Sequence, residues 1–217
     1  MSRFRISPRL RARRLARSER GGTLVEMAIV MPLLLLFIFG ILDYGRLFWT
    51  EAMAQKATEM TTRIASVRGA ACPGVPTMVG PASVPGEPAP RFGTLCRVGN
   101  TCANPGTVQC LMNDGDAATQ AVRDEIWTRV EPLMPPNATR ANLRIGYSFD
   151  ERLGFLGGPY RPIITAEIVN LTFTFVSPLG RIAALAAADP NVVLAETITY
   201  PAFSVSLPAE DLSSGAP

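Results

Sequence analysis

An uncharged run of 16 residues, from Met27 to Leu42, constrains this chain more than any other feature. Counted from Thr23, the apolar stretch is 20 residues long and contains one charged side chain, that of Glu26. About 20 helical residues cross the roughly 30 Å hydrocarbon core of a bilayer, because each adds about 1.5 Å. The run therefore predicts a membrane-spanning helix. A carboxylate at full depth costs roughly 2.5–3.5 kcal/mol, so we expect Glu26 to have a function.

The charges on the two sides of this run are unequal. Residues 1–20 contain eight arginines and one glutamate, whereas the rest of the chain has 13 basic and 17 acidic residues. Arginine runs can bind nucleic acid, but directly before an apolar span the positive-inside rule accounts better for them. We expect a single-pass protein of the inner membrane with residues 1–20 in the cytoplasm, its C-terminal domain periplasmic or extracellular, and no nucleic-acid partner.

The helix is expected to continue beyond the membrane. From Leu47 to Ile64, apolar side chains recur every three to five residues with charged side chains between them, which is typical of an amphipathic helix. Gly69 ends the pattern. Residues 69–116 contain seven prolines and eight glycines, which exclude long helices and central strands. This segment is predicted to be a long surface loop.

All four cysteines lie in that loop, after the span and on the side predicted to be oxidising. Four thiols within 39 residues predict two disulfides, with three possible pairings. A zinc site is the alternative, but the spacings include no Cys-x-x-Cys pair, so we expect no metal. The cysteines are Cys72, Cys96, Cys102 and Cys110.

The C-terminal part carries the patterns of a helix and a sheet. Apolar residues recur at helical spacing from Ala117 to Leu133, with Arg123 among the polar side chains beside them. Strands are predicted at about 142–149, 163–176 and 192–207, with a short helix at Pro178–Ala188. The expected fold is α+β: a long N-terminal helix, then a small domain of one or two helices packed on a mostly antiparallel sheet. The expected segments are a cleaved basic leader (1–21), the transmembrane and amphipathic helix (22–68), the Pro/Gly/Cys-rich loop (69–116) and the helix-plus-sheet domain (117–217).

The sequence offers no residue set for catalysis. It contains no histidine, which excludes Ser-His-Asp and Cys-His sites, and it lacks the common phosphate-binding and dinucleotide-binding motifs. Asn113–Asp116 is weakly similar to a calcium loop, but a turn accounts better for it. We therefore expect neither enzymatic activity nor a cofactor.

Gly21 and Gly22 lie between the arginine-rich segment and the apolar helix, where a protease at the inner membrane face needs an extended site of small residues. Cleavage between them would place Glu26 fifth in the mature chain and create a charged amine on Gly22. A carboxylate four residues on can neutralise that amine, in the same helix or from a neighbouring subunit. We interpret Glu26 as a residue that sets the register of stacked helices. The alternative is a glutamate that only favours a helix N-terminus.

The stretch from Arg20 to Arg46 resembles the TadE-like proteins, minor pseudopilins of the tight-adherence (Flp, type IVc) pilus systems of bacteria. In that family a glycine precedes the cleavage site, a glutamate is the fifth mature residue, and the apolar helix contains a proline and ends in an Asp/Gly/Arg turn. Met27 departs from the aromatic residue often found next in major pilins, and the cysteine-containing loop is outside the family pattern. The matching residues are Gly21, Glu26, Pro32, Asp43, Gly45 and Arg46.

The resemblance implies a membrane-anchored pseudopilin that a prepilin peptidase trims. Its partners would be other pilins, pseudopilins and inner-membrane assembly proteins. The alternative is an uncleaved membrane-anchored protein whose disulfide-bonded domain serves envelope binding or adhesion. A third class, a secreted enzyme, would need signal-peptidase cleavage at Ala52–Ala54, twelve residues past the apolar run, which is too far.

Overall fold

A computed structural model describes most of the 217-residue chain. The described residues are 19–83, 88, 90–99, 101–176, 197–210 and 212. The chain divides into two units. We call Met1–Arg46 with Phe175–Glu196 the span unit, and Leu47–Thr174 with Thr197–Pro217 the sheet unit.

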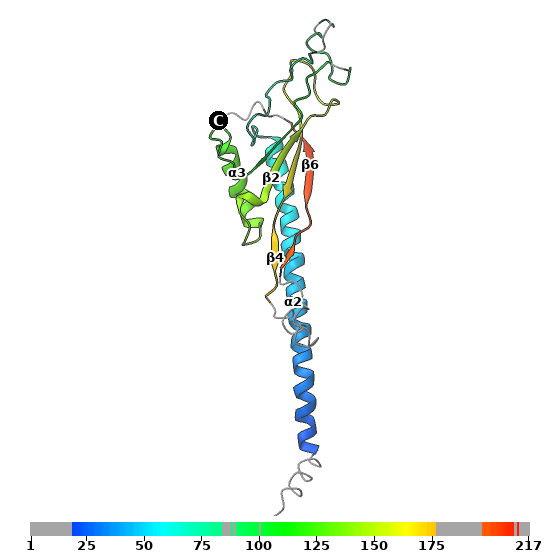
Figure 1. Cartoon of the computed structure of the whole chain (residues 1–217), viewed down its shortest axis with the longest axis vertical. Coiled ribbons are helices and arrows are strands. Elements are labelled where there is room, and N and C mark those ends of the chain that lie inside the picture. Colours follow the sequence, from blue (N-terminus) through cyan, green and yellow to red (C-terminus); the bar gives the residue numbers. More distant parts are fainter. Residues whose placement is uncertain are drawn as a thin grey trace, which may run out of the picture. The chain divides into compact units, whose positions relative to one another are not determined.

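The longest element is helix α2, Glu19–Ser66, which has 48 residues (Figure 1). At about 1.5 Å per residue it is roughly 70 Å long. The helix runs through Pro32, a residue that membrane helices tolerate. The long N-terminal helix expected from the sequence is thus confirmed, with ends slightly before those of the predicted range 22–68. It continues past Asp43–Arg46, so this segment is not the turn that the family resemblance implied.

The sheet unit contains a four-stranded antiparallel sheet in the order β1-β2-β3-β6. A separate antiparallel pair is formed by β4 and β5. The expected antiparallel sheet is therefore confirmed. The strands are β1 (Thr107–Leu111), β2 (Leu143–Ser148), β3 (Ile163–Ile168), β4 (Thr172–Thr174), β5 (Thr197–Thr199) and β6 (Ser204–Pro208).

One face of the four-stranded sheet is buried. Side chains alternate across a strand, and on β3 every second residue is buried while those between are half-exposed. The register places buried residues of β2 opposite buried residues of β3, so the two strands share one apolar face. These pairs are Leu143 with Ile168, Ile145 with Ala166, and Tyr147 with Ile164.

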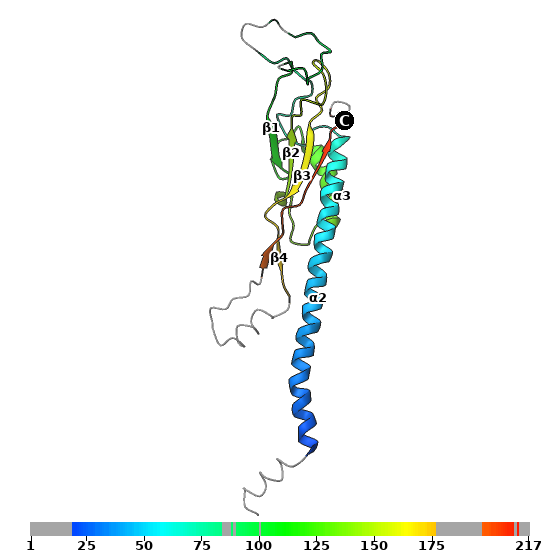
Figure 2. The ribbon, with the colours of Figure 1, turned by 90° about the vertical axis from the view of Figure 1, so that its right-hand side faces the viewer.

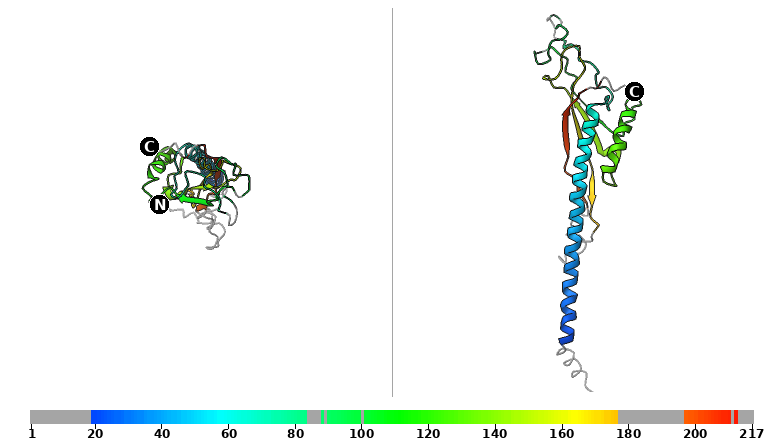
Figure 3. Two further views of the ribbon diagram at one scale, coloured as in Figure 1. Left: turned by 90° about the horizontal axis from the view of Figure 1, so that it is seen from above. Right: turned by 180° about the vertical axis from the view of Figure 1, so that it is seen from behind.

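Helices cover the buried face (Figure 2). One is α3, Gln120–Val130, followed by the 3-10 helices Glu131–Leu133 and Arg140–Asn142. The other is the part of α2 that belongs to the sheet unit. Its buried side chains are small, so the helix lies close to the strands. The Thr62 hydroxyl donates to the Val205 carbonyl at 3.3 Å. Seen from behind, α3 lies beside the end of α2 (Figure 3). The buried α2 residues are Ala54, Ala57, Thr58, Thr61, Thr62, Ala65 and Ser66.

The segment 69–116 corrects one expectation, because it is not loop throughout. Its residues Thr107–Leu111 form β1 at the edge of the sheet. An edge strand forms ladder hydrogen bonds on one side only, so Pro105 and Gly106 just before β1 are compatible with its pairing to the sheet. Prolines thus excluded a central strand, as expected, but not an edge strand.

Two predicted strands are each broken into two. The segment 163–176 bends between β3 and β4 at Asn170, which has a positive φ of 53°. The later segment is interrupted between β5 and β6 at Tyr200–Phe203, which includes Pro201. The helix predicted at Pro178–Ala188 and most of the basic leader lie outside the described residues.

Candidate functional site

Among the described residues, nothing covers the apolar half of α2. From Gly22 to Leu42 every side chain is exposed except Gly40, which is half-buried. The most apolar 18-residue window has a mean hydropathy of 2.6, and none of it is buried. Exposing so many apolar side chains to water is unfavourable. Moving one such side chain from water into apolar surroundings gains about 1.5–3 kcal/mol. By length and composition, this helix can span a membrane as a single-pass anchor.

The Gly21–Gly22 peptide bond lies in the first turn of α2, two residues after Glu19. The extended site expected from the sequence is therefore helical in this structure. Each glycine in a helix costs about 1 kcal/mol relative to alanine, so two adjacent glycines make this turn easier to unwind. A Cβ placed on Gly22 would have no atom within 4 Å. The fold itself does not require a glycine there.

Glu26 lies one helical turn after Gly22, on the same side of α2. Its side chain is exposed. Within the described part of the chain, no hydrogen bond or ion pair involves this carboxylate. The Glu26 carboxylate is therefore accessible on the surface of the described helix.

Asp43 is the one charged residue of the span unit that is deeply buried, with 3% of its surface exposed among the described residues. Its carboxylate accepts a hydrogen bond from the Val176 backbone N–H at 3.3 Å and pairs with the Arg46 guanidinium at 3.4 Å. The adjacent Tyr44 ring contacts Phe175 edge-on, with centroids 6.1 Å apart. Asp43 thus joins the end of the apolar run to a segment 133 residues later in the sequence.

Within the part of the chain that the structure describes, Gly45 and Pro32 show no comparable contact. A Cβ on Gly45 would meet nothing within 4 Å, so the fold does not demand glycine there. Among the residues of the family pattern, the structure brings Asp43 and Arg46 together. It leaves Glu26 exposed on the surface of α2.

The four cysteines form two disulfides, as expected. Cys72 is joined to Cys110 with a Cα–Cα distance of 5.5 Å, and Cys96 is joined to Cys102 at 5.1 Å. The structure thus selects one of the three pairings that the sequence left open. In this structure no cysteine is free, so all four sulfur atoms that a zinc site would use are in disulfides.

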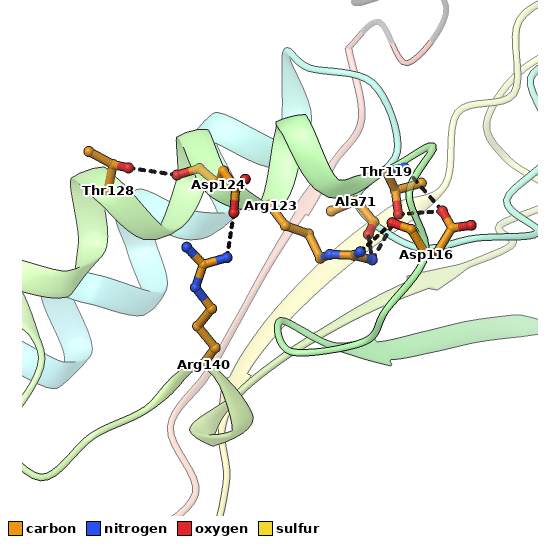
Figure 4. Close-up of polar contacts among 7 residues, drawn as sticks. All are labelled: Ala71, Asp116, Thr119, Arg123, Asp124, Thr128 and Arg140. Atoms are coloured by element: carbon orange, nitrogen blue, oxygen red, sulfur yellow. Dashed lines mark hydrogen bonds and ion pairs between the residues drawn. The ribbon is translucent and has the colours of Figure 1, made fainter.

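Arg123 forms a buried polar cluster that sequence reasoning missed. It is 2% exposed, and its guanidinium donates to the Ala71 carbonyl at 3.4 Å, the Thr119 hydroxyl at 2.8 Å and the Asp116 carbonyl at 2.5 Å (Figure 4). The Asp116 carboxylate in turn accepts from the Thr119 backbone N–H at 3.0 Å. This local bonding supports a turn, rather than a calcium loop, before α3.

The sequence did contain a signal for Arg123. It precedes Ile126, Trp127 and Val130 by three, four and seven residues, so it occupies the buried stripe of α3 instead of the polar flank to which it was assigned. A long cation within an apolar stripe needs several acceptors. Only the fold shows that the Ala71 and Asp116 carbonyls supply them.

The Ala71 backbone is held at both of its polar groups. Its N–H donates to the Tyr147 hydroxyl at 2.9 Å, and its carbonyl accepts from Arg123. Burial raises the pKa of Tyr147 to about 12, because the apolar surroundings disfavour the charged phenolate. These contacts and the neighbouring Cys72–Cys110 bond fix the chain just after α2 to the sheet.

A groove of about 310 Å³ lies between α2 and α3, and both of its carboxylates are engaged in ion pairs. Lys56 pairs with Glu59 at 2.9 Å, and Glu125 pairs with Arg68 at 2.9 Å and with Arg129 at 3.6 Å. Among the described residues, no three Cys, Asp or Glu side chains come together as metal ligands. The groove therefore offers no acid–base pair or metal site on which to base a reaction.

A family model described as TadE-like protein matches residues 21–63. No curated protein and no solved structure matches the chain. The match begins at Gly21, includes Glu26, Pro32 and Asp43–Arg46, and extends into the amphipathic half of α2. The resemblance drawn from residues 20–46 is thereby confirmed. Residues 21–63 are a TadE-like segment, and with their uncovered apolar helix they indicate a membrane-anchored, pilus-associated protein.

Proposed function

We propose that this chain is a minor pseudopilin of a tight-adherence (Flp, type IVc) pilus, trimmed by a prepilin peptidase between Gly21 and Gly22. The TadE-like match carries the proposal, because it begins at this peptide bond and covers the whole apolar helix. Such a helix needs lipid around it in the membrane and other apolar helices around it in a pilus. The partners would be other pilins, pseudopilins and inner-membrane assembly proteins.

The position of the scissile bond supports cleavage after a local unwinding. A peptidase binds its substrate as an extended strand, whereas Gly21 and Gly22 are in the first turn of α2. Two adjacent glycines make this turn less costly to open than the glycine-poor apolar run that follows. A glycine here serves the enzyme, since a side chain at Gly22 would meet nothing within the protein.

Glu26 would act after cleavage. The new amine of Gly22 carries a positive charge, and the N-terminal end of the helix adds its own partial positive charge. Glu26 is one turn away, so its carboxylate can neutralise this amine or that of an adjacent subunit. Between packed apolar helices, a charge left alone costs about 3–5 kcal/mol, which would favour one stacking register.

Paired substitutions separate processing from assembly. Gly21→Leu should leave the full-length precursor in the membrane, because the larger side chain does not fit a groove built for glycine. Glu26→Gln should be trimmed normally but fail to join the pilus, because the new amine loses its countercharge while the side-chain shape is kept. The measurements are intact mass, for the loss of residues 1–21, and co-purification with the other pilus components.

Two controls come from the same helix. A Cβ at Gly40 meets nothing within 4 Å, so Gly40→Leu should be trimmed like the natural chain. Glu51→Gln also removes one carboxylate from α2 but lies outside the apolar run, so assembly should persist. Assembly of Glu26→Gln at the natural level would reject its role in register. An unshortened natural protein would favour the uncleaved adhesion protein instead, and loss of residues 1–54 would favour a secreted product.

A further inference from the structure

We propose that Phe175 and Val176 form a second membrane contact, held at the outer surface of the bilayer by Asp43. The proposal rests on the membrane-spanning helix and does not depend on cleavage or pilus assembly. All of its residues belong to the span unit. The proposed partner is the interfacial region of the bilayer, where lipid headgroups meet the acyl chains.

The first step is the depth of Asp43. The apolar run ends at Leu42, and the 20 residues from Thr23 to Leu42 match the roughly 30 Å hydrocarbon core at about 1.5 Å per residue. Asp43 is the next residue, so it lies where acyl chains give way to headgroups. A carboxylate is tolerated at this depth, since the cost of a charge falls toward the interface.

The second step is the contact that brings the distant segment to this depth. The Asp43 carboxylate accepts the Val176 N–H at 3.3 Å, and the Phe175 ring lies 6.1 Å from the Tyr44 ring. A hydrogen bond to the backbone fixes where Val176 lies along the helix axis. Phe175 and Val176 therefore lie within a few ångströms of the level at which the apolar run ends.

The third step is the chemistry of the side chains at this level. Val176 is 73% exposed and Tyr44 is 55% exposed, while Phe175 is half-buried. Large apolar side chains at the surface are unfavourable in water, whereas tyrosine and other aromatic rings are enriched at membrane interfaces. The exposed apolar helix immediately before Asp43 indicates that lipid surrounds the protein at this level. We therefore commit to lipid as the partner of Phe175 and Val176.

Tryptophan fluorescence in a bilayer tests the contact. Trp49 and Trp127 are first replaced by phenylalanine in the full-length protein, and Phe175→Trp then supplies one reporter. The protein is placed in nanodiscs of phosphatidylcholine whose acyl chains carry bromine, which quenches nearby indole rings. We expect the Phe175→Trp emission to be weaker in brominated discs than in unbrominated discs. We also expect its maximum to be blue-shifted relative to that of a water-exposed tryptophan.

A matched control comes from Phe92, an aromatic residue of the sheet unit that is 79% exposed. Phe92→Trp in the same background should keep the emission of a water-exposed indole and should not be quenched. If Phe175→Trp behaves like Phe92→Trp, the membrane contact is wrong. A blue shift without quenching, dependent on protein concentration, would assign the contact to a second copy and would also overturn the proposal.

Asp43 variants test how the segment is held. In the Phe175→Trp protein, Asp43→Ala should abolish the quenching, because the Val176 N–H loses its acceptor. Asp43→Asn should retain it, because the amide oxygen still accepts this hydrogen bond without a charge. Quenching that survives Asp43→Ala would overturn the positioning role. The comparison of Phe175→Trp with Phe92→Trp remains decisive even if Asp43→Ala does not fold.

Discussion

Ala71 shows how a few residues attach the sheet to the end of the long helix. Its N–H and carbonyl are bonded to Tyr147 and Arg123, side chains that come from β2 and α3. Buried backbone groups need such partners, since each unsatisfied group costs about 1–3 kcal/mol. Arg123 donates to the carbonyls of both Ala71 and Asp116, so it links the chain after α2 to the turn before α3.

Arg123→Met should therefore destabilise the sheet unit strongly. Methionine fills much of the same volume but donates no hydrogen bond, which leaves the acceptors on Ala71, Asp116 and Thr119 without this donor. At about 1–3 kcal/mol for each buried group, we expect the free energy of unfolding to fall by at least about 2 kcal/mol. Urea unfolding of the full-length protein in detergent, followed by tryptophan fluorescence, measures the change.

The control is Arg129→Met in the same helix. The Arg129 side chain is 60% exposed and forms one ion pair with Glu125 at 3.6 Å. Exposed pairs of this kind contribute about 0–1 kcal/mol, so this variant should unfold at nearly the natural urea concentration. Equal losses for the two variants would show that the buried cluster contributes no special stability.

The disulfides connect elements of different kinds, and this sets their contributions. Cys72–Cys110 joins the chain after α2 to strand β1 and closes a sequence separation of 38 residues. Cys96–Cys102 closes a separation of only six residues within the loop. Closing a longer loop removes more entropy from the unfolded chain. The first bond therefore supports the fold, and the second shapes the loop.

Removing each bond in turn should reveal this difference. The loop-closure relation gives a loss of about 4 kcal/mol for Cys72→Ala with Cys110→Ala, and about 2 kcal/mol for Cys96→Ala with Cys102→Ala. Mass mapping without reductant should first find these two linkages in the natural protein. Guanidinium unfolding of both double variants then compares their stabilities. The reverse order of stability, or another pairing, would contradict this assignment.

The sequence predicted those elements that local pattern determines. The apolar run and its amphipathic continuation indicated α2, and the alternation from Leu143 to Phe149 indicated β2. Strand β1 was missed because five residues behind a Pro-Gly pair carry too little pattern, and its pairing with β2 is a long-range contact. The disulfide pairing, the Asp43–Val176 bond and the burial of Arg123 depend on distant residues in the same way. Gly21, Glu26 and the cysteines could be identified because their chemistry is local or compositional.

The whole molecule requires two different surroundings. The span unit exposes an apolar helix that needs lipid, and the sheet unit contains two disulfides that persist in an oxidising compartment. The basic leader lies at the opposite end of the apolar run from those disulfides. Positive charge before the span and cystine after it are independent features, and both favour the same orientation across an inner membrane.

Reporter fusions in a bacterial host test this orientation. Alkaline phosphatase attached after Pro217 should be active, because it folds only where its own disulfides form. Green fluorescent protein at the same position should be dark when exported through the general secretion pathway. The same two reporters attached before Met1 should give the opposite result, since the eight arginines of residues 1–20 hold that end in the cytoplasm. A fluorescent C-terminal fusion with inactive phosphatase would reverse the orientation. It would also place Cys72–Cys110 and Cys96–Cys102 in a reducing compartment, where neither bond should persist. The predicted orientation and the predicted disulfides must therefore both be right or both be wrong.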